Sequence, residues 1–285
     1  MRDRIYPGKI ILFGEYTIIN GGEVLAIPTS KMGARWAYAP SSDDRDATLM
    51  DYADYLSSMV PPPIDLELFL EDVNQGIFLQ SDIPVGYGCG SSGALVAAVF
   101  DSYNSQTQKY SLIELKEIFS RMESFFHGKS SGIDPLVSFL NRPVLINNDG
   151  IEILDGDFNG LMNNFFLLDS GKSKSTAEYV KIFNDKTTDK EFARKIDLLK
   201  DVVNMAIQNL VLHSDPRALH ENIKEISMLQ WSNFQEMIPV QIKSLWKSAL
   251  EQSDHTIKLC GSGGGGYFLV YAENSENTDL ELIPV

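Results

Sequence analysis

A glycine-rich segment between residues 84 and 94 contains the residue types best suited to binding a phosphate group. Its sequence is Pro-Val-Gly-Tyr-Gly-Cys-Gly-Ser-Ser-Gly-Ala, with glycines at positions 86, 88 and 90. Alternating glycines let the backbone approach a ligand closely, and an apolar stretch that favours helix follows them. The N-terminus of such a helix offers free N–H groups to a phosphate, and a serine hydroxyl can add a ligand for Mg²⁺. The alternative is a tight strand-to-helix turn in which Ser91 only caps the helix.

Four further side chains could do chemistry, and three of them, Lys9, His127 and Asp134, have a simpler interpretation. Lys9 lies within an apolar stretch, where a buried lysine is costly unless it is paired; the alternative is an edge-strand lysine that reaches solvent. Glu123 falls at the rim of the apolar face of a helix, where a carboxylate needs a cation. His127 follows four residues later, and we interpret it as a structural or surface histidine. Asp134 precedes a proline, which is typical of an N-cap at a helix start, although a capping aspartate can also be catalytic.

Three matches to nucleotide-binding patterns fail in their context. Gly-Lys-Ser occurs at 128–130 and at 171–173, but positions 123 and 166 hold Glu and Phe where a Walker A motif needs glycine. Glycines 261, 263 and 266 match G-x-G-x-x-G, but a strand-like stretch follows them, whereas the dinucleotide-binding fold requires a helix there. We therefore exclude both of these binding modes.

The elements that must position these residues are a mixture of strands and helices. We expect strands over residues 4–13, 24–39, 76–80, 256–260 and 267–272, with a hairpin from 143–146 to 151–154 around Asn-Asp-Gly. We expect glycine-rich loops over 84–93 and 261–266, and a polar surface loop over 40–48. Helices are expected over 94–100, 175–184, 190–212, 216–230 and 235–252, and from a capping box at Ser111 and Glu114 to Gly128. This order indicates an α+β chain of two domains, 1–157 and 158–285.

The composition is that of an acidic globular protein. The chain has 285 residues, of which 44% are hydrophobic and 22% charged, so disorder is a poor interpretation. Its net charge of −15 would repel a nucleic-acid backbone, and we expect no nucleic-acid partner. The longest apolar run, 94–100, is too short for a bilayer span, and the first residues lack the apolar stretch of a signal peptide. We therefore expect a cytoplasmic protein without a membrane partner.

In their order along the chain, three motifs resemble those of the GHMP kinase superfamily. They are Pro-Gly-Lys…Gly-Glu at 7–15, the glycine-serine segment at 84–92, and Lys-x-x-Gly-Ser-Gly-Gly-Gly at 258–265. The resemblance covers about residues 5–272. It implies a two-domain GHMP kinase fold, with an N-terminal domain similar to ribosomal protein S5 domain 2 and a ferredoxin-like C-terminal domain.

Within the superfamily, the segments Glu-x-x-x-His-Gly at 123–128 and Ser-Gly-Ile-Asp at 131–134 are most similar to mevalonate kinases. The resemblance implies that ATP and Mg²⁺ are used to phosphorylate the primary hydroxyl of mevalonate, giving 5-phosphomevalonate in isoprenoid biosynthesis, and it is compatible with a homodimer. It implies Asp134 as the catalytic base with Lys9 beside it, and Ser92 and Glu123 as Mg²⁺ ligands. It implies Gly86, Gly88, Cys89, Gly90, Ser91 and Ser92 as ATP-binding residues, and Glu15, Thr176, Gly261, Gly263 and Gly264 as substrate-binding residues.

Three positions depart from the pattern of that family. Tyr16 stands where mevalonate kinases usually have histidine, a feature that we associate with phosphomevalonate kinases. Cys89 occupies an apolar position between two glycines, and Gly93 stands where alanine is expected. The Tyr16 difference leaves the substrate open between mevalonate and phosphomevalonate, and Lys129, Lys172 and Lys174 could supply the extra positive charge that the second substrate needs. More distant alternatives are another GHMP small-molecule kinase and a non-catalytic ligand sensor on the same fold.

The two cysteines, Cys89 and Cys260, are too few for a disulfide framework. Both lie in or beside glycine-rich loops. We interpret them as small buried side chains; the alternative is a pair of thiols whose modification blocks ATP binding.

Overall fold

The computed structural model describes residues 3–39, 46–104, 110–155, 162–174, 176–212, 215–252, 254–273 and 280–285. The chain forms two compact units, each made of several segments. Unit 1 comprises Met1–Lys9, Pro28–Pro84 and Cys89–Arg142, and unit 2 comprises Ile10–Ile27, Val85–Gly88 and Pro143–Val285. The predicted domain boundary after residue 157 lies outside the described residues and stays a prediction.

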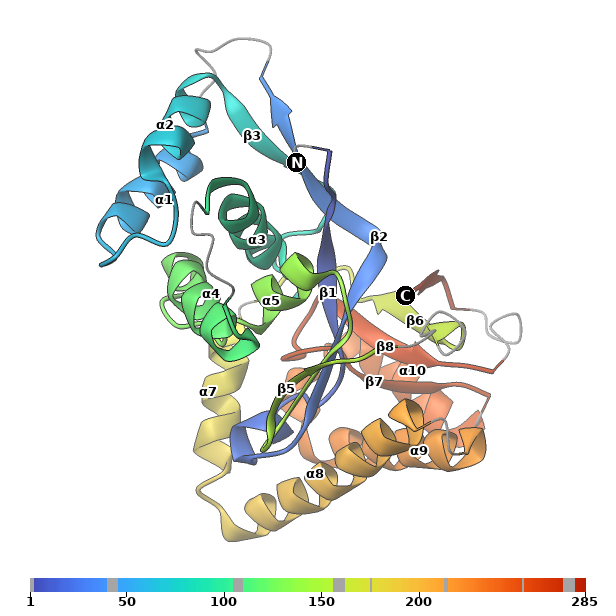
Figure 1. Ribbon diagram of the computed structural model, residues 1–285. Helices are drawn as coiled ribbons and strands as arrows, with labels where there is room; N and C mark the ends of the chain where they lie inside the picture. The colour runs from blue at the N-terminus through green and yellow to red at the C-terminus, as the bar shows by residue number, and fades with distance from the viewer. Residues whose placement is uncertain are drawn as a thin grey trace. The chain divides into compact units, whose positions relative to one another are not determined.

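Two long strands, β1 (Tyr6–Phe13) and β2 (Val24–Tyr38), contribute residues to both units. In unit 1, β2 pairs antiparallel with β3 (Ile77–Ser81), with Trp36 opposite Leu79. In unit 2, the start of β2 pairs antiparallel with β4 (Val144–Asn147), which forms a hairpin with β5 (Gly150–Ile153). The strands of this sheet follow the order β1-β2-β4-β5, with β3 on β2 (Figure 1).

The core of unit 1 is built around the apolar helix α3 (Ser91–Tyr103), which packs against α4 (Leu112–His127) and α5 (Ile133–Leu140) (Figure 1). The ring of Phe100 lies edge-on to those of Phe119 and Phe139, at 5.0 and 5.7 Å between centroids. Two further helices, α1 (Ala47–Ser57) and α2 (Leu66–Asn74), complete the unit. Most of α3 from Gly93 onward is buried, whereas Ser91 and Ser92 at its N-terminus are half-buried.

Unit 2 contains a second, antiparallel sheet whose strand order is β7-β8-β6-β9. Its strands are β6 (Phe165–Asp169), β7 (Thr256–Leu259), β8 (Tyr267–Tyr271) and β9 (Leu282–Pro284). Among its described residues, this unit has the helices η1 (Thr17–Asn20), α7 (Thr176–Lys186), α8 (Lys190–Val211), α9 (Pro216–Asn233), η2 (Gln235–Met237) and α10 (Val240–Gln252). The helices α9 and α10 pack on β7. Trp246, on α10, is buried and contacts both the sheet and α9: its ring lies against Phe268 of β8, and its Nε1–H donates to Ser227 of α9.

Most predicted elements are confirmed, and the exceptions have local causes. The capping box at Ser111 and Glu114 and the Gly128 end of α4 are present as predicted, and so is the hairpin. The predicted loop 40–48 is wrong at its end, because Asp46 caps α1 and the helix begins at residue 47. The predicted helix 235–252 is interrupted: η2 ends at Met237, and α10 begins directly after Pro239. The strands β6 and β9 were not predicted.

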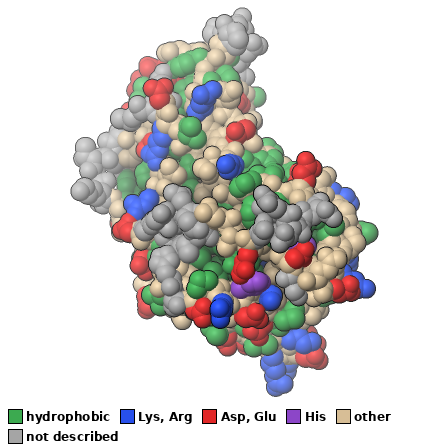
Figure 2. Space-filling view, turned by 90° about the vertical axis from the view of Figure 1, so that its right-hand side faces the viewer, with side chains coloured by type: hydrophobic (Ala, Val, Ile, Leu, Met, Phe, Trp, Pro, Cys, Tyr) green, Lys and Arg blue, Asp and Glu red, His purple; other side chains and the backbone are tan. Residues whose placement is uncertain are grey.

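On the face drawn in Figure 2, charged side chains of both signs are mixed, and the described lysine and arginine side chains lie among acidic ones. None of the described helices has both the length and the apolar composition that a bilayer crossing requires.

Candidate active site

The N-terminus of α3 lies at the end of the glycine-serine segment. Its N-cap is Gly90, in the left-handed region at φ +75°, and no side chain caps it. Ser91 is therefore the first helical residue, and the alternative interpretation of Ser91 as the N-cap is wrong. Because the first-turn N–H groups of a helix have no acceptor within the helix, this uncapped end provides donors for an anion.

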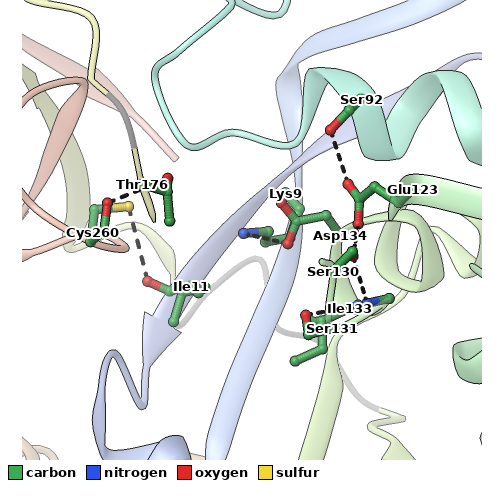
Figure 3. Close-up of polar contacts among 12 residues, drawn as sticks. Lys9, Ile11, Ser92, Glu123, Ser130, Ser131, Ile133, Asp134, Thr176 and Cys260 are labelled. Carbon is green, nitrogen blue, oxygen red and sulfur yellow. Dashed lines mark hydrogen bonds and ion pairs between the residues drawn. The ribbon is translucent and has the colours of Figure 1, made fainter. Parts of the chain in front are cut away.

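Ser92 and Glu123 meet between α3 and α4. The hydroxyl of Ser92 donates to Glu123 Oε1 at 2.9 Å, and the hydroxyl of Ser130 donates to Oε2 of the same carboxylate (Figure 3). Glu123 is only 3% exposed. Its burial, together with the negative charge of Asp134, raises the pKa of Glu123 to about 7, while the two serine hydroxyls and Lys9 oppose that rise. The carboxylate is thus held at both oxygens, and Ser130 is a partner that the sequence analysis did not single out.

His127 contributes to the same cluster. It is exposed at the end of α4, and its Nε2 lies 3.0 Å from the Ser92 hydroxyl oxygen. The expectation of a surface histidine is correct for its exposure, but it missed this contact.

Lys9 and Asp134 form an ion pair within unit 1. Lys9 Nζ lies 2.8 Å from Asp134 Oδ1 (Figure 3), and Lys9 is only 3% exposed. The alternative of an edge-strand lysine reaching solvent is therefore wrong. The expected N-cap role of Asp134 is also wrong, because Gly132 is the N-cap of α5 and Asp134 lies in its first turn. Asp134 is thereby free to turn its carboxylate toward Lys9.

Gly90, in the glycine-serine segment, and Gly93, in the first turn of α3, lie against Asp134. A Cβ on Gly93 would lie 2.7 Å from the Asp134 backbone carbon and 2.8 Å from its Cβ, distances too short for real atoms. A Cβ on Gly90 would lie 3.4 Å from Asp134 Oδ2. The close approach of α3 and α5 therefore explains why glycine stands at position 93 where alanine was expected.

In unit 2, Glu15 and Lys258 form a fully buried ion pair. Lys258 Nζ donates to a Glu15 carboxylate oxygen, to the Leu12 carbonyl at 3.0 Å and to the Leu259 carbonyl at 2.7 Å. Burial raises the pKa of Glu15, and the positive charge of Lys258 opposes that rise. The pair joins the end of β1 to the strand β7, just before the second glycine loop.

Tyr16 is anchored on that glycine loop. Its hydroxyl donates to the Ser262 carbonyl at 2.6 Å, and its ring stacks on Phe183 at 4.6 Å between centroids. Tyr16 has a positive φ of 65°, a conformation that is unfavourable for a bulky residue. Burial raises the pKa of Tyr16, so the phenol stays a neutral donor.

Four of the predicted substrate-binding residues, Thr176, Gly261, Gly263 and Gly264, lie in or beside the loop 261–266. Gly264 N donates to the Met237 carbonyl at 2.5 Å, and a Cβ on Gly263 would lie 2.6 Å from that carbonyl. The hydroxyls of Ser262 and Thr176 are 3.5 Å apart. Contacts with Met237, within unit 2, therefore hold the loop 261–266 in place, and Thr176 lies beside it.

Lys174 lies where three of the predicted glycines come together. The Lys174 backbone N–H donates to the Gly86 carbonyl at 3.0 Å. Cβ atoms on Gly88 and Gly261 would lie 3.3 and 3.6 Å from Lys174 Nζ. The ammonium group therefore lies against both glycine segments of unit 2.

Both cysteines are buried, as expected. Cys89 is 2% exposed and its carbonyl accepts from the Lys9 backbone N–H at 2.8 Å, and Cys260 is 4% exposed. Low exposure favours their interpretation as small buried side chains.

The residues of unit 1 fit a magnesium-bound nucleotide. Mg²⁺ prefers oxygen ligands and is usually held by one or two protein carboxylates, with waters and phosphate oxygens completing its shell. The Ser92 hydroxyl and the Glu123 carboxylate are oxygen donors within 2.9 Å of each other. Since they lie at the uncapped end of α3, a cation held by them would be close to a phosphate bound there.

Comparison with known proteins finds mevalonate kinases and related kinases. Residues 57–142 match the family model described as the GHMP kinase N-terminal domain. A mevalonate kinase of Archaeoglobus fulgidus is 24% identical over 91% of this chain and 88% of its own length. Among solved structures, L. major mevalonate kinase in complex with R-mevalonate has a TM-score of 0.66 at 18% identity, covering 95% of this chain and 87% of that one. The phosphomevalonate kinase of Streptococcus pneumoniae has a TM-score of 0.63 at 16% identity, covering 96% and 92%. The expected resemblance and the expected α+β fold are confirmed.

Proposed function

We propose that this chain transfers the γ-phosphoryl group of ATP to the primary hydroxyl of mevalonate. Two similarities support this proposal: residues 57–142 match the GHMP kinase N-terminal domain, and the fold is similar to that of a mevalonate kinase. The observation that carries this proposal is the Lys9–Asp134 ion pair of 2.8 Å, which lies against Gly90 at the uncapped N-terminus of α3. Such an arrangement combines a base for an alcohol with a binding site for a phosphate.

Asp134 acts as the base in this proposal. Its carboxylate accepts the hydroxyl proton as the alcohol oxygen attacks the γ-phosphorus, a step for which a positioned carboxylate is suited. Gly90 and Gly93 permit the close packing that fixes Asp134. The rigid placement matters because phosphoryl transfer depends mainly on alignment and on charge stabilisation.

Lys9 has two roles in this proposal. Its ammonium group holds the Asp134 carboxylate in position through the ion pair. Since it is buried, its positive charge also acts in a low-dielectric setting on the negative charge that develops on the transferred group.

The α3 N-terminus binds the phosphates of ATP through the N–H groups of Ser91, Ser92 and Gly93, with Gly86, Gly88, Cys89 and Gly90 in the preceding loop. Ser92 and Glu123 would hold Mg²⁺, which supplies charge neutralisation for the phosphate oxygens. On the acceptor side we assign Glu15, Thr176, Gly261, Gly263 and Gly264. The product is 5-phosphomevalonate, and the reaction belongs to isoprenoid biosynthesis by the mevalonate pathway.

The alternative acceptor is phosphomevalonate. The observation that favours it is the position of the Lys174 ammonium against Gly88 and Gly261, because a doubly charged phosphate would benefit from a nearby cation. The similarity in fold to a phosphomevalonate kinase is compatible with either acceptor.

The test is an ADP-release assay with MgATP and four acceptors: mevalonate, phosphomevalonate, galactose and homoserine. We expect turnover with mevalonate only. Turnover with phosphomevalonate only would keep the kinase assignment and overturn the acceptor. Absence of turnover with all four, while ATP still binds, would favour the ligand-sensor alternative.

A further inference from the structure

His127 shares a hydroxyl group with Glu123. The Ser92 oxygen lies 2.9 Å from Glu123 Oε1 and 3.0 Å from His127 Nε2. Glu123 and His127 are four residues apart on α4, so they lie on the same face of the helix. Both can therefore reach the single serine that α3 presents to them.

Counting protons fixes the direction of these two hydrogen bonds. A serine hydroxyl has one proton and two lone pairs, and an ionised carboxylate can only accept. When Glu123 is ionised, as a metal ligand must be, the Ser92 proton points to Glu123 Oε1. The Nε2 atom of His127 must then carry a hydrogen and donate it to the Ser92 oxygen. One lone pair of that oxygen is occupied, and the other remains available.

We propose that His127 is a positioning residue for the Mg²⁺–nucleotide complex: its Nε2–H holds the Ser92 hydroxyl in the one orientation that directs its remaining lone pair to the cation. This inference rests on the proposed function, since it concerns the cation that accompanies ATP. Outer hydrogen-bond partners of metal ligands generally matter in this way, and their loss costs about 10- to 100-fold in metal affinity. His127 itself does not touch the cation.

A purely structural role for His127 predicts something different. A histidine in the last turn of a helix can interact with the helix dipole and stabilise the fold, and this effect does not depend on Ser92. The two roles are separated by variants that keep or remove the donor. His127→Gln retains an N–H donor on a side chain of similar reach, whereas His127→Leu removes it. His220 on α9, which contacts Glu273, offers a matched control as His220→Gln.

The experiment measures binding without turnover. Isothermal titration with a non-hydrolysable ATP analogue (adenylyl imidodiphosphate) is carried out with Mg²⁺ and again with EDTA, and thermal unfolding is followed for each variant. We expect His127→Leu to weaken Mg²⁺-dependent binding by about 10- to 100-fold and to leave binding in EDTA unchanged. His127→Gln and His220→Gln should bind as the wild type does. In a Ser92→Ala background, His127→Leu should cause no further loss, because the two residues act through one contact.

Unchanged Mg²⁺-dependent binding by His127→Leu would overturn the inference, and so would any of three further results. The first is equal weakening of binding with Mg²⁺ and with EDTA, which indicates a structural role. The second is a His127→Gln variant as weak as His127→Leu, and the third is full additivity with Ser92→Ala. A wild-type protein that binds no Mg²⁺–nucleotide would overturn the proposed function itself, and this outcome is distinct from a wild type that binds while His127→Leu has no effect.

Discussion

The hydroxyl of Tyr16 donates to the carbonyl of Ser262 at 2.6 Å, joining residues that are 246 positions apart in the chain. The bond attaches the segment that follows β1 to the glycine loop 261–266. Because the phenol is buried against Phe183 and Phe234, water cannot readily replace the contact. Tyr16 therefore fixes the loop that we assign to the acceptor.

We predict that Tyr16→Phe raises KM for the acceptor more than it changes KM for ATP. The variant leaves the Ser262 carbonyl without its donor, which costs about 1–3 kcal/mol when the group is buried. Steady-state kinetics with each substrate varied in turn gives the split, and urea unfolding gives the stability. An unchanged acceptor KM would show that the loop does not depend on this bond.

The sequence predicted the local features of this site well and its contacts less well. Glycine spacing and the capping box are local signals, so the 84–93 loop and α4 could be placed from the residues alone. Asp134 was misjudged as an N-cap because the Asp-Pro pair is a local signal too. The actual N-cap of α5 is Gly132, and glycine is needed there because any Cβ would clash with the Lys116 carbonyl. The contacts of Ser130 and His127 depend on how α3, α4 and α5 pack, and no short-range pattern encodes that packing.

We predict that Asp134→Asn lowers kcat by about 10²- to 10⁴-fold, the usual contribution of a general base. The amide keeps the size of the carboxylate but cannot take the proton. Binding of the ATP analogue should change little, since phosphate donors remain at the α3 N-terminus. Asp149→Asn, at the exposed tip of the β4–β5 hairpin, is the matched control and should have wild-type kinetics. A near-wild-type rate for Asp134→Asn would exclude it as the base.

We predict that Gly93→Ala destabilises unit 1, although alanine favours helix over glycine by about 1 kcal/mol. The added methyl group would lie 2.7 Å from the Asp134 backbone, and overpacking of this kind costs about 1–3 kcal/mol. The resulting shift of α5 should also lower kcat by displacing Asp134. Urea unfolding together with kcat tests both effects. A variant that is more stable and fully active would mean that the two helices separate easily.

We predict that the stability of the metal-free protein falls as pH rises between about 4.5 and about 7, through the titration of Glu123. Burial raises the pKa of Glu123 to about 7 in the folded state from an ordinary value of 4.5. The folded state therefore keeps a proton that the unfolded state loses, so stability is highest below this window and decreases across it. Glu123→Gln should have a flatter profile than the wild type. Identical profiles in urea titrations from pH 4 to 8 would contradict this assignment.

The buried pair of Glu15 and Lys258 leads to a prediction that contrasts removal of one charge with removal of both. Lys258→Met alone leaves the Glu15 carboxylate buried without its cation, which is expected to cost about 3–5 kcal/mol of stability at neutral pH. Burial already raises the pKa of Glu15, and loss of Lys258 removes the charge that opposes this rise. Glu15 should therefore take up a proton in the folded variant, and the deficit should shrink as pH is lowered.

The double variant Glu15→Gln with Lys258→Met removes both charges together. Replacing a whole buried ion pair is often nearly neutral, so the double variant should regain most of the lost stability and lose the pH dependence of Lys258→Met. Urea unfolding of the wild type, the two single variants and the double variant at pH 5.5 and 8 gives the coupling energy directly. If the two single effects simply add, the two charges contribute no favourable coupling, and Lys258 would act only through the hydrogen bonds that its Nζ donates to the Leu12 and Leu259 carbonyls.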